Sequence, residues 1–196
     1  MSLTDVPAGQ LAAIVTFLEM RAPPADLAVP LSPLTLRRVR LTPDAYRSLF
    51  RAVGSPWLWF SRLVMSDTDL GAIIADPSVE LYEVRDGDEA IGMLELDRRG
   101  EGQCELSFVG LIPAYTGRGH GRWLLAEAVS RAWAPGTTRV HVHTCSLDHP
   151  AALGAYRRAG FRAFARKVET FIDPRLAGIL PRGAAPQVPL LASGTS

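Results

Sequence analysis

The sequence predicts a single α/β domain whose one mixed, largely antiparallel sheet is flanked by helices. Its 196 residues, 47% hydrophobic and 21% charged, are the size and composition of an ordinary globular chain that buries about 70% of its surface. After an N-terminal strand segment, the expected order is strand, two helices, a three-strand meander, helix, strand, helix and strand. Because this order combines hairpins with one helical crossover, it favours a mixed sheet over a regular doubly wound one.

The N-terminal part of the chain predicts two strands and then two helices. Residues 12–20 are rich in β-branched and aromatic side chains, and residues 34–41 alternate apolar with basic ones, so both are typical of strands. Thr42 before Pro43 marks a helix start, because the hydroxyl caps free amides and proline fits the first helical position. Helices are expected over residues 42–53 and 66–75.

A meander of three strands follows, over residues 79–84, 90–96 and 105–112, separated by hairpin turns rich in Gly and Asp. The rest of the chain predicts a helix with an apolar stripe from Leu124 to Ala132, a strand over 139–145, a helix over 150–159 and a strand over 161–172. Residues 1–181 are expected to form one domain with an added N-terminal strand at about 10–21, and residues 182–196 a disordered tail.

Charge and composition exclude several classes of function. The formal net charge of +1 gives no general attraction to nucleic acid or acidic membranes. No apolar run approaches the ~20 residues needed to span a bilayer, and no signal peptide is expected at the N-terminus. Cys104 and Cys145 show neither a disulfide framework nor metal-ligand spacing, which favours a reducing, cytoplasmic location.

The segment from Thr116 to Arg122 lies between a predicted strand and a predicted amphipathic helix and holds three glycines, Gly117, Gly119 and Gly121. Glycines there let the backbone approach an anion closely, and the first free amides of the helix point to the same place. The spacing matches neither the dinucleotide fingerprint nor the P-loop. It predicts a phosphate-binding cradle, with an ordinary glycine-rich turn as the alternative.

This segment resembles the acyl-CoA loop of the GCN5-related N-acetyltransferase (GNAT) family, Gln/Arg-x-x-Gly-x-Gly/Ala, with Thr116 where Gln or Arg is usual. Downstream, residues 149–161 resemble the family's Asn-x-x-Ala-x-x-x-Tyr-x-x-x-Gly-Phe helix, with Tyr156 retained and His149 in place of Asn. The resemblance covers residues 34–172. It implies the GNAT acyl-CoA N-acyltransferase fold.

The resemblance also implies acetyl-CoA as co-substrate and assigns roles to matching positions. Tyr156 is expected near the sulfur as general acid, and the backbone of residues 109–111 near the carbonyl oxygen. The residues expected to bind the cofactor are Leu111, Ile112, Gly117, Arg118, Gly119, His120, Gly121 and Arg122.

Glu105 is the best candidate for a general base, because the strand from Glu105 to Phe108 resembles the segment in which well-studied family members carry a catalytic glutamate. Strand alternation places Glu105 on one face with Val109 and Leu111. Glu95 is the rival, and a neutral amine acceptor could need no dedicated base.

The expected function is direct transfer of an acetyl group from acetyl-CoA to a primary amine of a small molecule or peptide, by a monomer or a homodimer, with no nucleic acid, membrane or metal involved. The rings of Trp57 and Trp59 either form an acceptor wall or belong to the core. A non-catalytic acyl-CoA sensor or scaffold is the first alternative. The second is a metal-dependent enzyme using His141 and His143, which alternate on one strand.

Overall fold

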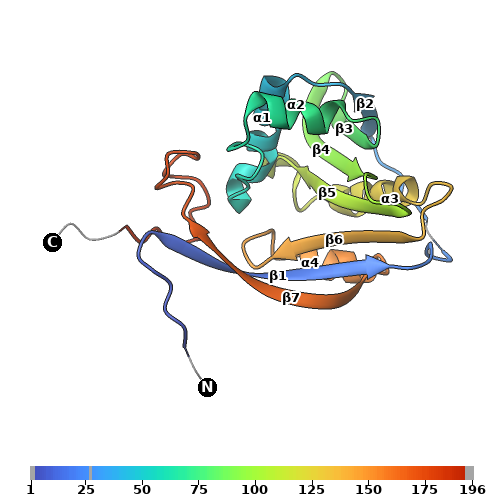
Figure 1. Cartoon of the computed structure of the whole chain (residues 1–196). Helices are drawn as coiled ribbons and strands as arrows, with labels where there is room; N and C mark the ends of the chain where they lie inside the picture. Colours follow the sequence, from blue (N-terminus) through green and yellow to red (C-terminus); the bar gives the residue numbers. More distant parts are fainter. Residues whose placement is uncertain (1–2, 27, 193–196) are drawn as a thin grey trace.

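The computed structural model describes residues 3–26 and 28–192, which form one seven-stranded mixed sheet with strand order β2-β3-β4-β5-β6-β1-β7 (Figure 1). The strands are β1 (Gln10–Met20), β2 (Thr35–Val39), β3 (Val79–Asp86), β4 (Glu89–Asp97), β5 (Gln103–Leu111), β6 (Arg139–Cys145) and β7 (Arg162–Ile172). The α-helices are α1 (Pro43–Gly54), α2 (Asp67–Ala75), α3 (His120–Ala132) and α4 (Ala152–Arg158), and the 3-10 turns are η1 (Ser55–Trp57) and η2 (Pro113–Tyr115). The predicted fold class is confirmed.

Two hydrophobic cores cover the two faces of the sheet. Helices α1 and α2 bury Phe50 and Leu70 against one face, together with Met93 of β4. Helices α3 and α4 bury Leu124 and Tyr156 against the other face. Successive residues of a strand point to opposite faces, which is why Leu94, the neighbour of Met93, belongs to the core of α3 and α4.

The first two helices begin where the sequence indicates. The Thr42 hydroxyl accepts a hydrogen bond from the Ala45 amide at 3.3 Å, and the Ser66 hydroxyl accepts one from the Asp69 amide at 3.1 Å. Each side chain satisfies an amide that has no partner within its helix. None of the described helices is long and apolar enough to cross a bilayer.

Strand β1 lies inside the sheet and not at its edge. It pairs antiparallel with β6 and with β7, so that Val15 lies opposite Cys145 on one side and opposite Lys167 on the other. The N-terminal strand therefore completes the sheet within one chain.

The sheet opens between β5 and β6, which form the one parallel pair in the described part of the chain. Pairing runs only from Gln103 opposite Arg139 to Glu105 opposite His141, and beyond this point the strands diverge (Figure 1). A bulge accompanies the opening: Glu95 of β4 pairs with Phe108 and its neighbour Leu96 with Leu106, leaving the residue between them, Ser107, unpaired.

Because of the bulge, the side-chain alternation predicted for β5 is wrong. Cys104 and Leu106 lie in the core of α3, and so does Leu111, which follows the bulge, whereas Phe108 packs in the core of α1. Glu105 therefore does not share a face with Val109 and Leu111, because the extra residue shifts the alternation by one position.

The segment after β7 differs from the predicted disordered tail over residues 182–192. Leu180 and Ala185 are buried against Leu58, and the buried Arg175 guanidinium donates to the carbonyl of Val188 at 2.8 Å. The composition is typical of mobile chain, but hydrogen bonds from Arg175 fix its backbone. The last part of the predicted tail, residues 193–196, lies outside the described residues.

Candidate active site

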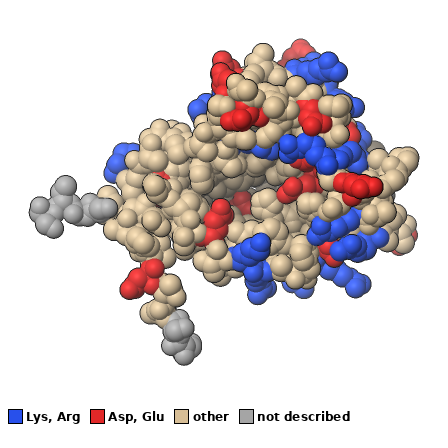
Figure 2. Space-filling view, viewed as in Figure 1, with Lys and Arg blue, Asp and Glu red and all other residues tan. Residues whose placement is uncertain are grey.

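A cleft of about 1100 Å³ occupies the opening between β5 and β6. Its lining comes from both faces of the sheet: Tyr156 and Ala152 of α4 on one side, and Phe108, Trp59 and His143 on the other. The cleft thus passes through the sheet. In Figure 2 the surface is hollowed between the part carrying α1, α2 and β3 to β5 and the part carrying β6, β1 and β7.

The glycine cradle lies at one end of this cleft. Gly117 and Gly119 have φ angles of 75° and 84°, a conformation that other residues adopt only with strain. Gly119 directly precedes the first residue of α3, and Gly117, Gly119, Gly121 and Arg122 line the cleft. A methyl group on any of the three glycines would meet open space. Free helical amides, the positive end of the helix dipole and a guanidinium therefore surround a space suited to an anion.

Three predicted cofactor residues do not line the cleft. The Arg118 guanidinium lies over the ring of Tyr115, and His120 packs beside the same ring. Ile112 packs against both cores, and its amide donates to the carbonyl of Ile91 at 2.9 Å. Among the predicted cofactor residues outside the cradle, only Leu111 lines the cleft.

Tyr156 of α4 lines the cleft while remaining buried, with 9% of its surface exposed. Its ring packs edge-on against Phe161. Burial raises the pKa of the Tyr156 hydroxyl above its ordinary value, and the nearby Asp148 carboxylate acts in the same direction. The hydroxyl therefore stays protonated at neutral pH, as a proton donor must.

The opposite end of the cleft is an aromatic wall made of Trp57, Trp59 and Phe60. The Trp59 indole N–H donates to Asp148 Oδ1 at 3.1 Å, and the ring of Trp57 lies edge-on to that of His149 at 5.0 Å. The two tryptophans thus attach the η1 segment to the loop before α4. The other aromatic residues of this region, Tyr46 and Phe50, belong to the core.

Asp148 is a site residue that the sequence analysis missed. Its Oδ2 atom accepts hydrogen bonds from the Thr144 hydroxyl at 2.7 Å and from the Cys145 amide at 2.8 Å. Together with the bond from Trp59, these contacts join the end of β6 to the aromatic wall. The sequence feature that could have identified Asp148 is its position directly before His149, the first residue of the second motif.

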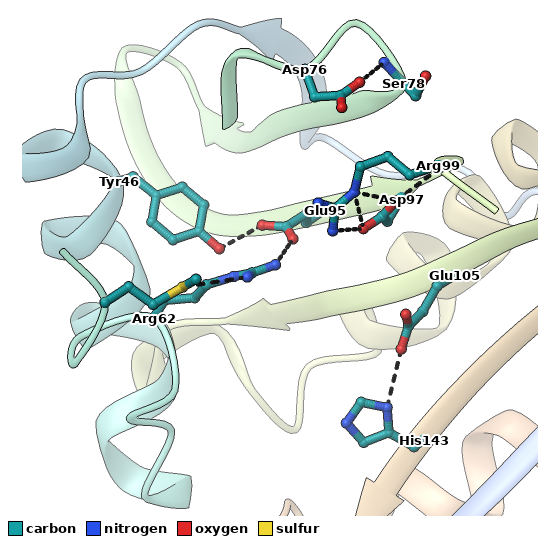
Figure 3. Close-up of polar contacts among 10 residues, drawn as sticks. Tyr46, Arg62, Asp76, Ser78, Glu95, Asp97, Arg99, Glu105 and His143 are labelled. Atoms are coloured by element: carbon teal, nitrogen blue, oxygen red, sulfur yellow. Dashed lines mark hydrogen bonds and ion pairs between the residues drawn. The ribbon is translucent and has the colours of Figure 1, made fainter. Parts of the chain in front are cut away.

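Glu105 does not line the cleft, although it contacts a residue that does. Its carboxylate contacts the ring of His143, with 3.2 Å between Oε1 and Nδ1 (Figure 3). The hydrogen bond from His143 lowers the pKa of Glu105 and outweighs the effect of burial. His143 itself lines the cleft.

Glu95, the rival base, is buried with no exposed surface. Its carboxylate accepts a hydrogen bond from the Tyr46 hydroxyl at 2.5 Å and pairs with the Arg62 guanidinium at 2.5 Å (Figure 3). Both oxygens are thus engaged between α1 and the loop that follows η1. Glu95 does not line the cleft.

His141 and His143 lie on the same face of β6, as alternation predicts. Within residues 3–26 and 28–192 there is no group of three or more His, Cys, Asp or Glu side chains placed to hold a metal ion.

The fold and the site define a mixed α/β protein whose sheet opens between two parallel strands, with a glycine cradle suited to an anion at the start of the next helix. The family model described as "Acetyltransferase (GNAT) family" matches residues 44–161, which include the cradle and Tyr156. The chain belongs to the GNAT family.

Individual relatives agree with this placement. The chain is 35% identical over 92 residues to the N-alpha-acetyltransferase RimI of Mycobacterium tuberculosis, a match that spans 45% of this chain and 56% of that protein. A GCN5-related N-acetyltransferase from Sphaerobacter thermophilus has a similar fold, with a TM-score of 0.58 and 21% identity over 85% of this chain and 52% of that chain.

A Bacillus subtilis acetyltransferase in complex with CoA gives a TM-score of 0.52 and 20% identity, covering 67% of this chain and 78% of that chain. At these identities the structural matches establish the fold alone.

Proposed function

We propose that the protein transfers an acetyl group from acetyl-CoA directly to a primary amine of a small molecule or peptide. The observation that carries the proposal is the cleft through the sheet, which connects an anion cradle on one face with an aromatic wall on the other. A thioester held from one face and an amine entering from the other would meet inside the opening. The similarity to an N-alpha-acetyltransferase, RimI, and to an acetyltransferase in complex with CoA supports the same chemistry.

The cradle residues are suited to hold the diphosphate of acetyl-CoA. The amides after Gly119 and the guanidinium of Arg122 would offer donors to its oxygens. Among the described residues, no strand pairs with the edge of β5 facing β6 beyond Glu105, so the backbone there would be available to pair with the pantetheine arm. An amide near Gly110 would face the carbonyl oxygen, which gains negative charge during transfer.

Tyr156 is suited to donate a proton to the departing thiolate. It lies on the α4 side of the opening, buried and facing the cleft. The acceptor amine would enter beside Trp59 on the opposite side, and its proton would leave toward Glu105 and His143. Each face of the sheet thereby takes one of the two proton transfers.

The test is release of CoA from acetyl-CoA with a panel of amines and N-terminal peptides, comparing the parent with Tyr156→Phe. Loss of the hydroxyl should lower kcat by about 10²-fold or more, while the Kd for acetyl-CoA measured by calorimetry stays within about twofold, because the ring remains.

Tyr82→Phe is the matched control, since the Tyr82 hydroxyl bonds to Glu80 on β3, away from the cleft. It should turn over at the parental rate. A parental rate for Tyr156→Phe would refute the acid role. Tight binding of acetyl-CoA without turnover of any amine would instead identify a sensor or scaffold.

A further inference from the structure

The imidazole ring of His143 lies between Glu105 and the cleft. His143 lies on β6, lines the cleft and leaves 50% of its side chain exposed. Glu105 lies on β5 at the last residue pair before the strands diverge and does not reach the lining. Figure 3 shows the Nδ1 atom of the ring facing Glu105 and the second ring nitrogen turned away from it.

We propose that His143 is the catalytic base that takes the proton of the acceptor amine, and that Glu105 is a positioning residue acting through it. This assignment rests on the proposed acetyl transfer and names the group that serves it on the acceptor face.

The hydrogen bond determines which nitrogen acts as base. An ionised carboxylate is an acceptor only, so the 3.2 Å contact requires the hydrogen of the imidazole to be on Nδ1. In the neutral ring Nε2 then carries a lone pair and no hydrogen. Glu105 thus selects the tautomer in which the nitrogen turned away from the carboxylate is the proton acceptor.

Packing on β1 limits how the ring can turn. Phe17 lies opposite His143 in the strand register, with ring centroids 5.8 Å apart. The Lys167 ammonium lies over the ring of Phe17 at 5.2 Å. The imidazole is therefore held between an aromatic ring and a carboxylate in one orientation, which efficient proton transfer requires.

The charged groups around His143 favour its protonated form. The bond to Glu105 raises the pKa of His143 above its ordinary value against the opposing effect of burial, and the carboxylates of Asp148 and Glu169 add to the rise. Burial lowers the pKa of His141, which lies on the same face of β6. The positive charge that arrives with the amine proton is thus stabilised.

The side chains described account for every proton that moves in the reaction. As the amine nitrogen forms its bond to the acetyl carbon, its proton passes to Nε2, and an imidazolium paired with Glu105 results. The carbon–sulfur bond breaks, and Tyr156 donates its proton to the thiolate sulfur. The imidazolium then releases a proton to solvent, and the tyrosinate regains one.

The test compares His143→Gln and Glu105→Gln with His141→Gln, a matched control two residues away on the same face of the same strand. His143→Gln should lower kcat by about 10²-fold or more, because an amide accepts no proton. His141→Gln should change kcat less than threefold. Equal thermal melting temperatures would show that all three variants fold.

The pH profile separates a positioning role from a direct one. A base must be unprotonated, so kcat/KM falls as the pH drops below the pKa of His143. Since the Glu105 carboxylate raises that pKa, Glu105→Gln should move this acidic limb to lower pH and reduce kcat. Ionisation of the acceptor amine affects kcat/KM of the parent and of the variant equally, so it drops out when one pH profile is divided by the other.

Proton NMR provides a readout independent of turnover. The ring signal lost in His143→Gln identifies His143, and its titration midpoint should fall in Glu105→Gln. An unchanged midpoint would overturn the positioning role.

If the parent acetylates amines while His143→Gln keeps the parental kcat, the base assignment is wrong, and loss of activity in Glu105→Gln alone would make Glu105 the direct base. If the parent acetylates no amine, the proposed function fails and this assignment fails with it.

Discussion

At the scale of single residues, the carboxylate of Glu95 is the most enclosed charge near the cleft. It has no exposed surface and engages Tyr46 of α1 and Arg62, whose guanidinium also lies over the ring of Phe108 at 5.2 Å. Removing one partner of a buried pair leaves the other charge without compensation. Glu95 therefore anchors the loop that follows η1 to α1 and β4.

Glu95→Ala should lower the free energy of unfolding by about 3–5 kcal/mol, measured by urea denaturation. Asp67→Ala is the control: its bond to Arg47 is nearly as short, at 2.6 Å, but its side chain is 76% exposed, so the loss should stay below about 1 kcal/mol. Equal losses in the two variants would contradict the anchoring role of Glu95.

The conformation of Gly119 leads to a second prediction at this scale. Gly119→Ala should cost about 1–2 kcal/mol of stability, because φ is 84°, and should weaken acetyl-CoA binding by placing a methyl group in the open cradle. Calorimetry measures the affinity and denaturation the stability.

Gly136→Ala is the matched control, since Gly136 has φ of 86° and open space around it in the turn between α3 and β6. It should lose similar stability with unchanged affinity. Loss of affinity in both variants would show that strain, and not the added methyl group, is responsible.

The sequence predicts some site residues and not others for physical reasons. Tyr156 and the cradle glycines stand in local motifs whose conformation depends on a few neighbouring residues. The pairing of Glu105 with His143 depends on the register between β5 and β6, and Asp148 acquires its role from Trp59, 89 residues away. Local patterns do not contain such contacts.

At the scale of elements, the helices, the meander and the crossover follow the predicted order with small boundary differences. Helix α4, for example, begins at Ala152 and not at residue 150. The bulge at Ser107 could not be predicted, because a strand containing one extra residue has the same composition as a regular strand. That single residue decides which face of the sheet Glu105 occupies.

The segment after β7 depends on the ion pair of Arg175 with Asp173, in which each side chain is 2% exposed. Arg175→Ala should release this segment from Leu58, since the guanidinium also bonds to the carbonyls of Ala184 and Val188. Limited chymotryptic digestion with mass spectrometry should then show cleavage within residues 176–191 at least tenfold faster than in the parent.

Arg21→Ala is the control, because Arg21 forms an ion pair with 69% of its side chain exposed; its digestion should match the parent.

Burial of Asp173 opposes ionisation, but bonds from Arg175 lower the pKa of Asp173 below its ordinary value. Its contribution to stability is therefore present above the ordinary aspartate pKa and is lost as the pH falls toward the lowered value. Protection from digestion should weaken in that acidic range.

At the scale of the whole molecule, each face of the sheet supports a different part of the cleft. The core of α3 and α4 supports the cradle and Tyr156, and the core of α1 and α2 supports the aromatic wall. The sequence predicted this sheet but not the position of its first strand, because a strand pattern does not specify its partners. The structure places that strand beside the last one.

The interior position of β1 has a consequence for how the protein is made. Strand β1 pairs with residues 140–145 and 162–172, so residues 21–139 must be synthesised after β1 before either of its neighbours exists. A nascent chain halted before β7 would leave one edge of β1 without its partner, and chains with an exposed strand edge are natural clients for chaperones.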